Sequence, residues 1–188
     1  MILGAILASL RDVCLFRRGP EDMPYSQPLL VALLVACGAL QVAFNVHDGV
    51  QRALIAGAVV GGVAMVWLVF LLLRGTGKVE RFVQTATALA AVYLLFGLAK
   101  NVLTLLLPVK AWQQQMMAEP GHLPVVTGHQ VPVMFVIAAL VIWQFCAWVG
   151  ILRRSLEIPV AGGVLVFLLL LFVNVIVAAL TAGAIGVA

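Results

Sequence analysis

Imidazole, carboxylate and thioether groups can together hold a metal ion, and this sequence has few of each. Its three histidines, His47, His122 and His129, stand near Asp48 and Glu119. Histidine beside a carboxylate is typical of a zinc site. No HxxxH or HExxH spacing joins these residues. We therefore predict no metal site, and the three histidines remain the candidates should one exist.

The sequence does not predict a catalytic triad or dyad either. The acidic residues expected on the cytoplasmic side of a membrane are Glu21, Asp22, Glu80 and Glu157. The histidines are expected on the opposite side, so no Ser/His/Asp or Cys/His set shares one face. The three cysteines lack CxxC spacing, and "RGTGKVE" at 74–80 lacks the full GxxxxGK[ST] pattern of a phosphate-binding loop. We expect no enzymatic activity and no cofactor.

Polar side chains inside the long apolar runs form a second group of candidates. Lys100 is the ionisable one, and the amides are Gln41, Asn45, Asn101, Gln144 and Asn174. An unsatisfied polar group in hydrocarbon costs several kcal/mol, so each needs a partner. Hydrogen bonds between helices, or snorkelling of Lys100 to the interface, are the favoured explanation. The alternative is a polar pocket near the outer leaflet, able to hold a lipid headgroup or a carboxylate, built from Asn45, Lys100, Asn101 and Asn174.

The elements that carry these residues are predicted to span a membrane. The 188 residues are 64% hydrophobic and 10% charged, too apolar for the surface of a water-soluble globule. The apolar residues lie in runs of about 20, the length that crosses ~30 Å of hydrocarbon as a helix. The predicted spans are about 28-46, 53-73, 85-107, 131-152 and 160-187.

The N-terminal segment is predicted to lie along the membrane surface. Apolar residues recur there at spacings of three and four, which indicates a short amphipathic interfacial helix: Ile2, Leu3, Ile6, Leu10, Val13 and Cys14. Gly19, Pro20 and Pro24 then end it, and Ser26 with Pro28 opens the first span. The predicted domains are therefore 1-27, an interfacial helix with a juxtamembrane turn, and 28-188, a five-helix transmembrane bundle.

Basic residues fix the predicted orientation, because they are retained on the cytoplasmic side of a span. One side holds Arg11, Arg17, Arg18, Arg74, Lys78, Arg81, Arg153 and Arg154, and the other holds Arg52 and Lys110. We predict an all-α, multi-pass protein of the cell inner membrane with its N-terminus in the cytoplasm and its C-terminus outside. Because the basic residues form no continuous patch, nucleic acid is not an expected partner.

Small residues indicate close helix packing. Gly57 and Gly61 form a GxxxG pair, and Ala32/Ala36 and Ala179/Gly183 are spaced in the same way. Such pairs let helix backbones approach within lipid. We expect these small-residue pairs to pack helices of the same chain against each other, and not to form the interface of a dimer.

Charged residues on the cytoplasmic side form a predicted interaction face: Arg17, Arg18, Glu21, Asp22, Arg81, Arg153 and Arg154. Internal pairing of Glu21 and Asp22 with Arg81 or Arg153 is the favoured use of the two carboxylates. Contact with a partner protein is the alternative.

Three stretches of the sequence are similar to those of a known protein family: "FRRGPEDMPYS", "GTGKVERFVQTATALAAVYLL" and "WQFCAWVGILRRSLEIP". With five spans, they resemble bacterial members of the Yip family, five-helix proteins related to the eukaryotic Rab-GTPase-interacting membrane proteins. The resemblance implies a five-helix inner-membrane protein without known catalytic residues.

The function we expect is that of a non-enzymatic accessory or scaffold protein in membrane organisation or a membrane protein complex. Its expected partners are the lipid bilayer and other membrane proteins or further copies of itself. The alternative is a small-molecule, lipid or ion transporter that uses the polar pocket. The absence of an intramembrane Asp or Glu from the predicted spans weakens proton-coupled transport.

Overall fold

The computed structural model describes residues 11–15, 17, 19–47, 52–119, 126 and 128–186. Within these ranges the chain is helical and contains no strand. Two 3-10 turns and six α-helices follow one another: η1 (Pro20–Asp22), α2 (Gln27–His47), α3 (Arg52–Gly75), η2 (Val79–Arg81), α4 (Phe82–Thr104), α5 (Val109–Ala118), α6 (Gln130–Leu156) and α7 (Val160–Gly186).

Five of these helices are long and apolar enough to cross a membrane: α2, α3, α4, α6 and α7. Each has at least 21 residues, and a helix rises 1.5 Å per residue, so each covers the ~30 Å of a hydrocarbon core. Large apolar side chains such as Phe135 and Leu180 are exposed on their outer surfaces, where lipid would surround them. The prediction of five helices long and apolar enough to span a membrane is confirmed.

Two spans, α4 and α6, differ from the predicted bounds by three residues or more. α4 runs from Phe82 to Thr104 instead of 85-107. Pro108 disfavours helical backbone in the residue before it, so the chain leaves the helix ahead of the proline. α6 continues to Leu156 instead of 152. Arg153 and Arg154 stay helical there, because cations are favourable in the last turn of a helix.

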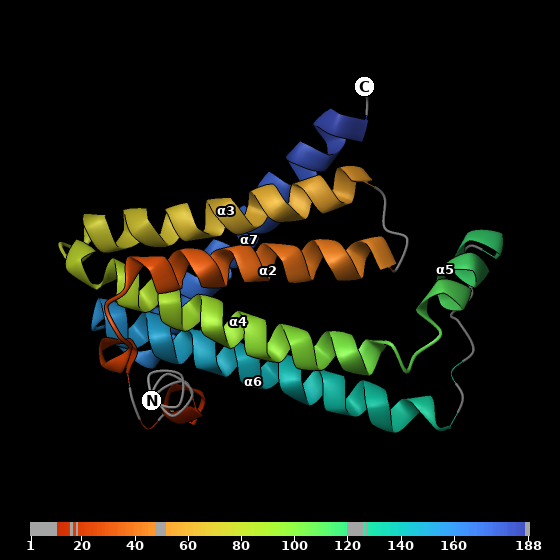
Figure 1. The fold of residues 1–188 in the computed structure, drawn as a ribbon, viewed down its shortest axis with the longest axis horizontal. Helices are drawn as coiled ribbons and strands as arrows, with labels where there is room; N and C mark the ends of the chain where they lie inside the picture. Colours follow the sequence, from red (N-terminus) through yellow and green to blue (C-terminus); the bar gives the residue numbers. More distant parts are fainter. Residues whose placement is uncertain are drawn as a thin grey trace.

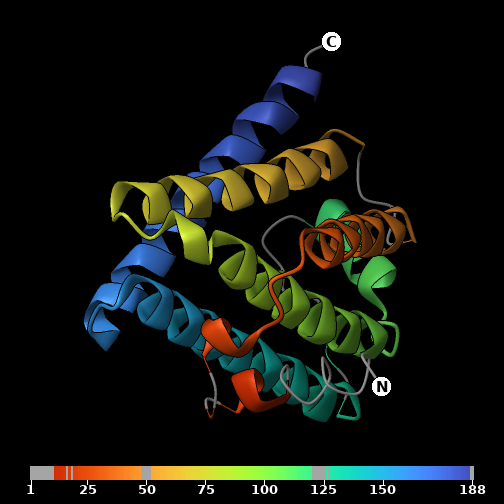
Figure 2. The same ribbon diagram turned by 60° about the vertical axis from the view of Figure 1, so that its left-hand side comes forward.

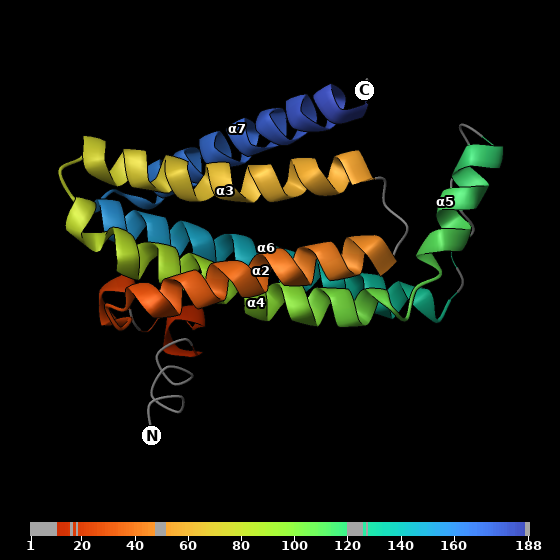
Figure 3. The same ribbon diagram turned by 45° about the horizontal axis from the view of Figure 1, so that its top comes forward.

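The spanning helices form two layers, with α3 and α7 in one and α2, α4 and α6 in the other (Figures 1 and 3). α3 packs along α7, while α4 lies between α2 and α6. Within the second layer α4 is the most buried span of the five. In Figure 2, α3 and α6 end, and α4 and α7 begin, at the same end of the bundle. The core gathers towards this end, and its members include Val69, Leu73, Val92 and Leu152.

Two glycines allow the close contact between α3 and α7. A Cβ added at Gly57 would lie 2.4 Å from the carbonyl oxygen of Ala178. At Gly61 it would lie 3.2 Å from Nδ2 of Asn174. The prediction that this GxxxG pair packs inside the chain is confirmed. Ala179/Gly183 is not part of the contact, since a Cβ at Gly183 would meet nothing within 4 Å.

The chain ahead of α2 packs against the second layer. Residues 1–10 of the expected interfacial helix lie outside the described residues, and 11–14 form one helical turn. Val13 and Cys14 of this turn belong to the hydrophobic core, and Arg11 is exposed. Nε1 of Trp143, in α6, donates a hydrogen bond of 2.9 Å to the carbonyl oxygen of Cys14. This contact ties the turn to the flank of α6.

Candidate functional site: the charged end of the bundle

Three segments far apart in the sequence meet at one end of the bundle. They are the chain around η1, the turn between α3 and α4 that contains η2, and the turn between α6 and α7. In Figure 1 this end is on the left, opposite α5. We call it the charged end, and it contains Lys78, Arg81, Arg153, Arg154 and Glu157.

Glu157 links two of these segments. Its Oε2 lies 2.7 Å from Nζ of Lys78, and its Oε1 lies 2.8 Å from Nη2 of Arg81. The backbone of Glu157 is left-handed, with φ of 56°, and ends α6. A residue with a Cβ pays roughly 1–2 kcal/mol for that conformation, which a glycine would avoid. The two ion pairs give a physical reason for glutamate at this position.

Lys78 also stabilises the end of α6 directly. Its Nζ donates a hydrogen bond of 2.8 Å to the carbonyl oxygen of Leu156. The last carbonyls of a helix have no partner within it, and a cation there also meets the negative end of the helix dipole. Lys78 therefore binds both the carboxylate of Glu157 and the C-terminal end of α6.

These contacts set the charge state of Glu157. Hydrogen bonds from Lys78 and then from Arg81, with the positive charge of both, lower the pKa of this carboxyl from its ordinary value of about 4.5. The side chain is 56% exposed, so solvent screens the pairs. Their role is to fix the position of the turns more than to add a large stabilisation.

A buried pair of hydroxyls connects α4 with α6 beside these ions. Oγ1 of Thr85 and Oγ of Ser155 lie 2.8 Å apart, and both residues are almost fully buried. Thr85 also donates to the carbonyl oxygen of Arg81 at 2.8 Å. A hydroxyl has one proton, so Ser155 is the donor to Thr85.

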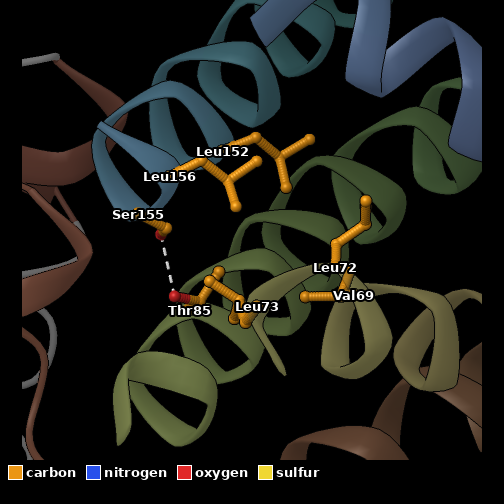
Figure 4. Close-up of a pocket in the computed structure, with 7 residues that line it drawn as sticks. All are labelled: Val69, Leu72, Leu73, Thr85, Leu152, Ser155 and Leu156. Carbon is orange, nitrogen blue, oxygen red and sulfur yellow. Dashed lines mark hydrogen bonds between the residues drawn. The ribbon is translucent and has the colours of Figure 1, made fainter. Parts of the chain in front are cut away.

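Leucine and valine side chains from α3 and α6 surround the hydroxyl pair (Figure 4). They are Val69, Leu72, Leu73, Leu152 and Leu156. The space between them does not admit a water molecule. This part of the charged end is thus packed core with no room for a ligand.

Gln84, in α4, binds the third segment, which is the chain around η1. Its Nε2 donates to the carbonyl oxygens of Glu21 at 2.9 Å and of Met23 at 3.0 Å. The side chain of Met23 is 1% exposed and packs in the core. η1 is closed by Asp22, whose Oδ2 accepts from the backbone N–H of Gly19 at 3.2 Å. The chain before α2 is therefore held to α4 by both polar and apolar contacts.

The expected pairing of Glu21 and Asp22 with Arg81 or Arg153 is wrong among the residues that the structure describes. Arg81 pairs with Glu157 instead, because the α6–α7 turn brings that carboxylate beside η2. Both Glu21 and Asp22 are exposed. Of the remaining residues of the predicted interaction face, Arg17 and Arg153 are exposed, Arg154 is half-buried, and Arg18 lies outside the described residues.

Two of the amides predicted to line a polar pocket donate hydrogen bonds to backbone carbonyls. Nδ2 of Asn174 donates to the carbonyl oxygen of Gly61 in α3. Nδ2 of Asn45 donates to the carbonyl oxygen of Gln41, one turn earlier in α2, at 2.8 Å. Asn174 lies in the layer of α3 and α7, whereas Asn45 lies in the other layer. Lys100 and Asn101 follow one another near the end of α4 and are half-buried.

The two described histidines lie at helix ends. His47 is the last residue of α2 and is exposed, and His129 directly precedes α6. His122 and Asp48 lie outside the described residues. Within the described ranges, no group of three or more His, Cys, Asp or Glu residues comes together.

Sequence reasoning missed Glu157, Thr85 and Ser155 as parts of this end. A usable signal existed for Glu157, an acidic residue directly after a span whose expected side also carries Lys78 and Arg81. No comparable signal marks Thr85 and Ser155, because hydroxyls within a spanning helix most often bond to their own backbone.

The fold defines a class, an all-helical protein with five candidate membrane spans. Comparison with protein-family models, with curated proteins and with solved structures finds no match to this chain.

Proposed function

We propose that this protein is a non-enzymatic scaffold or accessory protein of the cell inner membrane, with its N-terminus and the charged end in the cytoplasm and its C-terminus outside. The excess of Lys and Arg at the charged end supports this orientation. A reporter that is active only outside the cytoplasm tests it when fused after residue 188. Activity is expected, and an inactive but fully synthesised fusion would refute the orientation.

The observation that carries the proposal is the way Glu157 joins the turns of the charged end. Lys78 and Arg81 of one turn hold Glu157 of another, and the Thr85–Ser155 pair fixes α4 to α6 beside them. A surface with fixed geometry can bind a partner without paying to order its own loops. Rigid turns of this kind suit a docking surface.

Three exposed arginines supply the charge for docking: Arg74 and Arg153 at this end, and Arg17 in the chain ahead of η1. Unlike Lys78 and Arg81, they have no ion-pair partner among the residues that the structure describes. Arginine is enriched in protein interfaces, and complementary charge directs association. The proposal therefore favours a partner with acidic cytoplasmic segments.

Purification from native membranes in gentle detergent tests this function. The wild type is expected to bring a companion protein, or a second copy of itself. The triple variant Arg17→Glu, Arg74→Glu, Arg153→Glu should lose that companion and stay folded. Its melting temperature should fall slightly, because Glu at positions 74 and 153 meets the negative ends of α3 and α6. The matched control reverses the cations of the opposite end, Arg52→Glu with Lys110→Glu, and should keep the companion. A wild-type protein that is always monomeric and alone would overturn the proposal.

The resemblance to short bacterial Yip-family proteins agrees with this function. It rests on the sequence stretches around η1, around η2 with the start of α4, and across the end of α6. These stretches are also the segments that meet at the charged end. Membership of that family is part of the proposal.

Lys100 favours transport as a second candidate function. It is an ionisable residue within a candidate span, it is half-buried, and no ion pair joins it to another described residue. Such residues often mark a substrate or ion pathway. Uptake by liposomes that contain the purified protein, if lost in Lys100→Leu, would support this candidate. Uptake equal to that of empty liposomes would exclude it.

A further inference from the structure

α5 stands apart from the helix bundle. It joins α4 to α6 at the end opposite the charged end, and beyond isolated contacts it packs against no other described element. With ten residues it is too short to cross a membrane. A helix this short is marginal in water without packing, so its surroundings must contribute to its stability.

The side chains of α5 divide into two faces. Val109, Trp112 and Met116 follow one another at spacings of three and four and so share one stripe. Lys110 and Gln114 lie on the other side of the helix, and both are exposed. Met116 is 47% exposed although it belongs to the apolar stripe. Val109 and Trp112 are half-buried, and no described helix makes more than isolated contacts with α5.

The turn that leads into α5 indicates what covers the stripe. Leu105 and Leu106 directly follow α4 and are 52% and 64% exposed. Consecutive exposed leucines at the end of a membrane span remain favourable only while lipid still surrounds them. The lipid boundary therefore reaches the turn, and α5 begins at Val109, immediately beyond it.

The direction of α5 also fits the membrane surface. In Figures 1 and 3 it runs across the direction of α2 and α4. Because α2 and α4 are candidate membrane spans, a helix that runs across their direction is inclined towards the plane of the bilayer surface. Tryptophan is enriched at this depth, where its ring meets both apolar chains and polar headgroups.

We infer that α5 is an interfacial helix that binds the surface of the lipid bilayer through Val109, Trp112 and Met116, with Lys110 and Gln114 facing water. This inference goes beyond the scaffold function. It uses the proposed orientation only to name the leaflet, which is the outer one. The partner is the lipid itself, and the helix would hold the loop between α4 and α6 at the headgroup level.

Nitroxide labels on α5 test the depth of its two faces. They are attached to single cysteines at positions 112, 116, 110 and 114 of a protein in which Cys14, Cys37 and Cys146 are replaced by alanine. In phosphatidylcholine nanodiscs, labels at 112 and 116 should collide more with oxygen than with a water-soluble nickel chelate. Labels at 110 and 114 should show the opposite preference. Preference for the chelate at all four positions, or shielding of 112 and 116 from both reagents by protein, would overturn the inference.

Tryptophan fluorescence tests the same point with the native cysteines in place. The difference between the spectra of the wild type and Trp112→Phe isolates the emission of Trp112. Brominated phosphatidylcholine should quench it more when the bromines lie near the headgroup than near the chain end. Trp67, exposed on the spanning helix α3, is the matched control, and lipid bromines should quench it too. Emission of Trp112 that is typical of water and insensitive to bromine would refute the inference. Neither measurement depends on a protein partner, so the scaffold proposal fails or survives separately.

Discussion

The hydroxyl oxygens of Thr85 and Ser155 lie 2.8 Å apart, although the residues are 70 positions apart in the sequence. Both side chains are buried, at 0% and 1% exposure. Ser155 donates this bond, because the proton of Thr85 is directed at the carbonyl oxygen of Arg81. The two residues therefore have unequal roles, and their replacements should have unequal effects.

Thr85→Val should destabilise the fold by about 1–2 kcal/mol, because it leaves the buried hydroxyl of Ser155 without its acceptor. Ser155→Ala should cost less, since Thr85 keeps its bond to Arg81. The double variant should cost less than the sum of the two single variants. Unfolding of the purified protein in mixed micelles by increasing SDS measures these differences.

Thr87→Val is the matched control for Thr85→Val. Thr87 is equally buried, but its Oγ1 donates to the carbonyl oxygen of Val83 in its own helix. Its replacement breaks no contact between helices and should change stability by less than about 1 kcal/mol. Equal losses in the two valine variants would contradict the special role of the Thr85–Ser155 pair.

Gly57→Ala should weaken the contact between α3 and α7. The added Cβ would meet the carbonyl oxygen of Ala178 at 2.4 Å, so the helices must move apart. Overpacking of this kind costs roughly 1–3 kcal/mol. Gly62→Ala, where a Cβ would meet nothing within 4 Å, should be neutral or stabilising by up to ~1 kcal/mol. Thermal unfolding of both variants in nanodiscs compares them, and equal melting temperatures would contradict the close contact.

Acid should loosen the charged end through Glu157. Its pKa is lowered in the folded protein by the hydrogen bonds from Lys78 and Arg81. The stabilisation is therefore present above the unfolded value of about 4.5 and is lost as the pH falls below it through the folded pKa. Melting temperatures measured from pH 7 down to this acidic range should show that loss.

Glu157→Gln should lower the melting temperature at neutral pH and flatten its dependence on acid. Glu80→Gln changes an exposed carboxylate of η2 that has no part in these pairs, so it should keep the wild-type profile. A wild-type acid profile that persists in Glu157→Gln would rule out the ion pairs as its source.

Gln84→Leu should release the chain around η1. The variant removes the donor that reaches the carbonyl oxygens of Glu21 and Met23. Faster hydrogen exchange is expected for the backbone N–H groups of Asp22 and Met23, which close η1. Gln27→Leu, at an exposed position, is the control and should leave exchange unchanged. Mass spectrometry of peptides over residues 19–26 reads out both variants, and unchanged exchange in Gln84→Leu would show that apolar packing alone holds this segment.

The sequence by itself determined the five candidate spans and the small-residue contact at Gly57 and Gly61. Both follow from local chemistry, since the length of an apolar run matches the bilayer and a missing Cβ permits close approach. Only the tertiary structure decided that Arg81 pairs with Glu157, that Ser155 meets Thr85, and that the amide of Asn174 is used within the bundle. Each of these contacts depends on which helices pack against each other. Such pairings are set by packing over the whole bundle, and several polar partners would have satisfied the local sequence equally well.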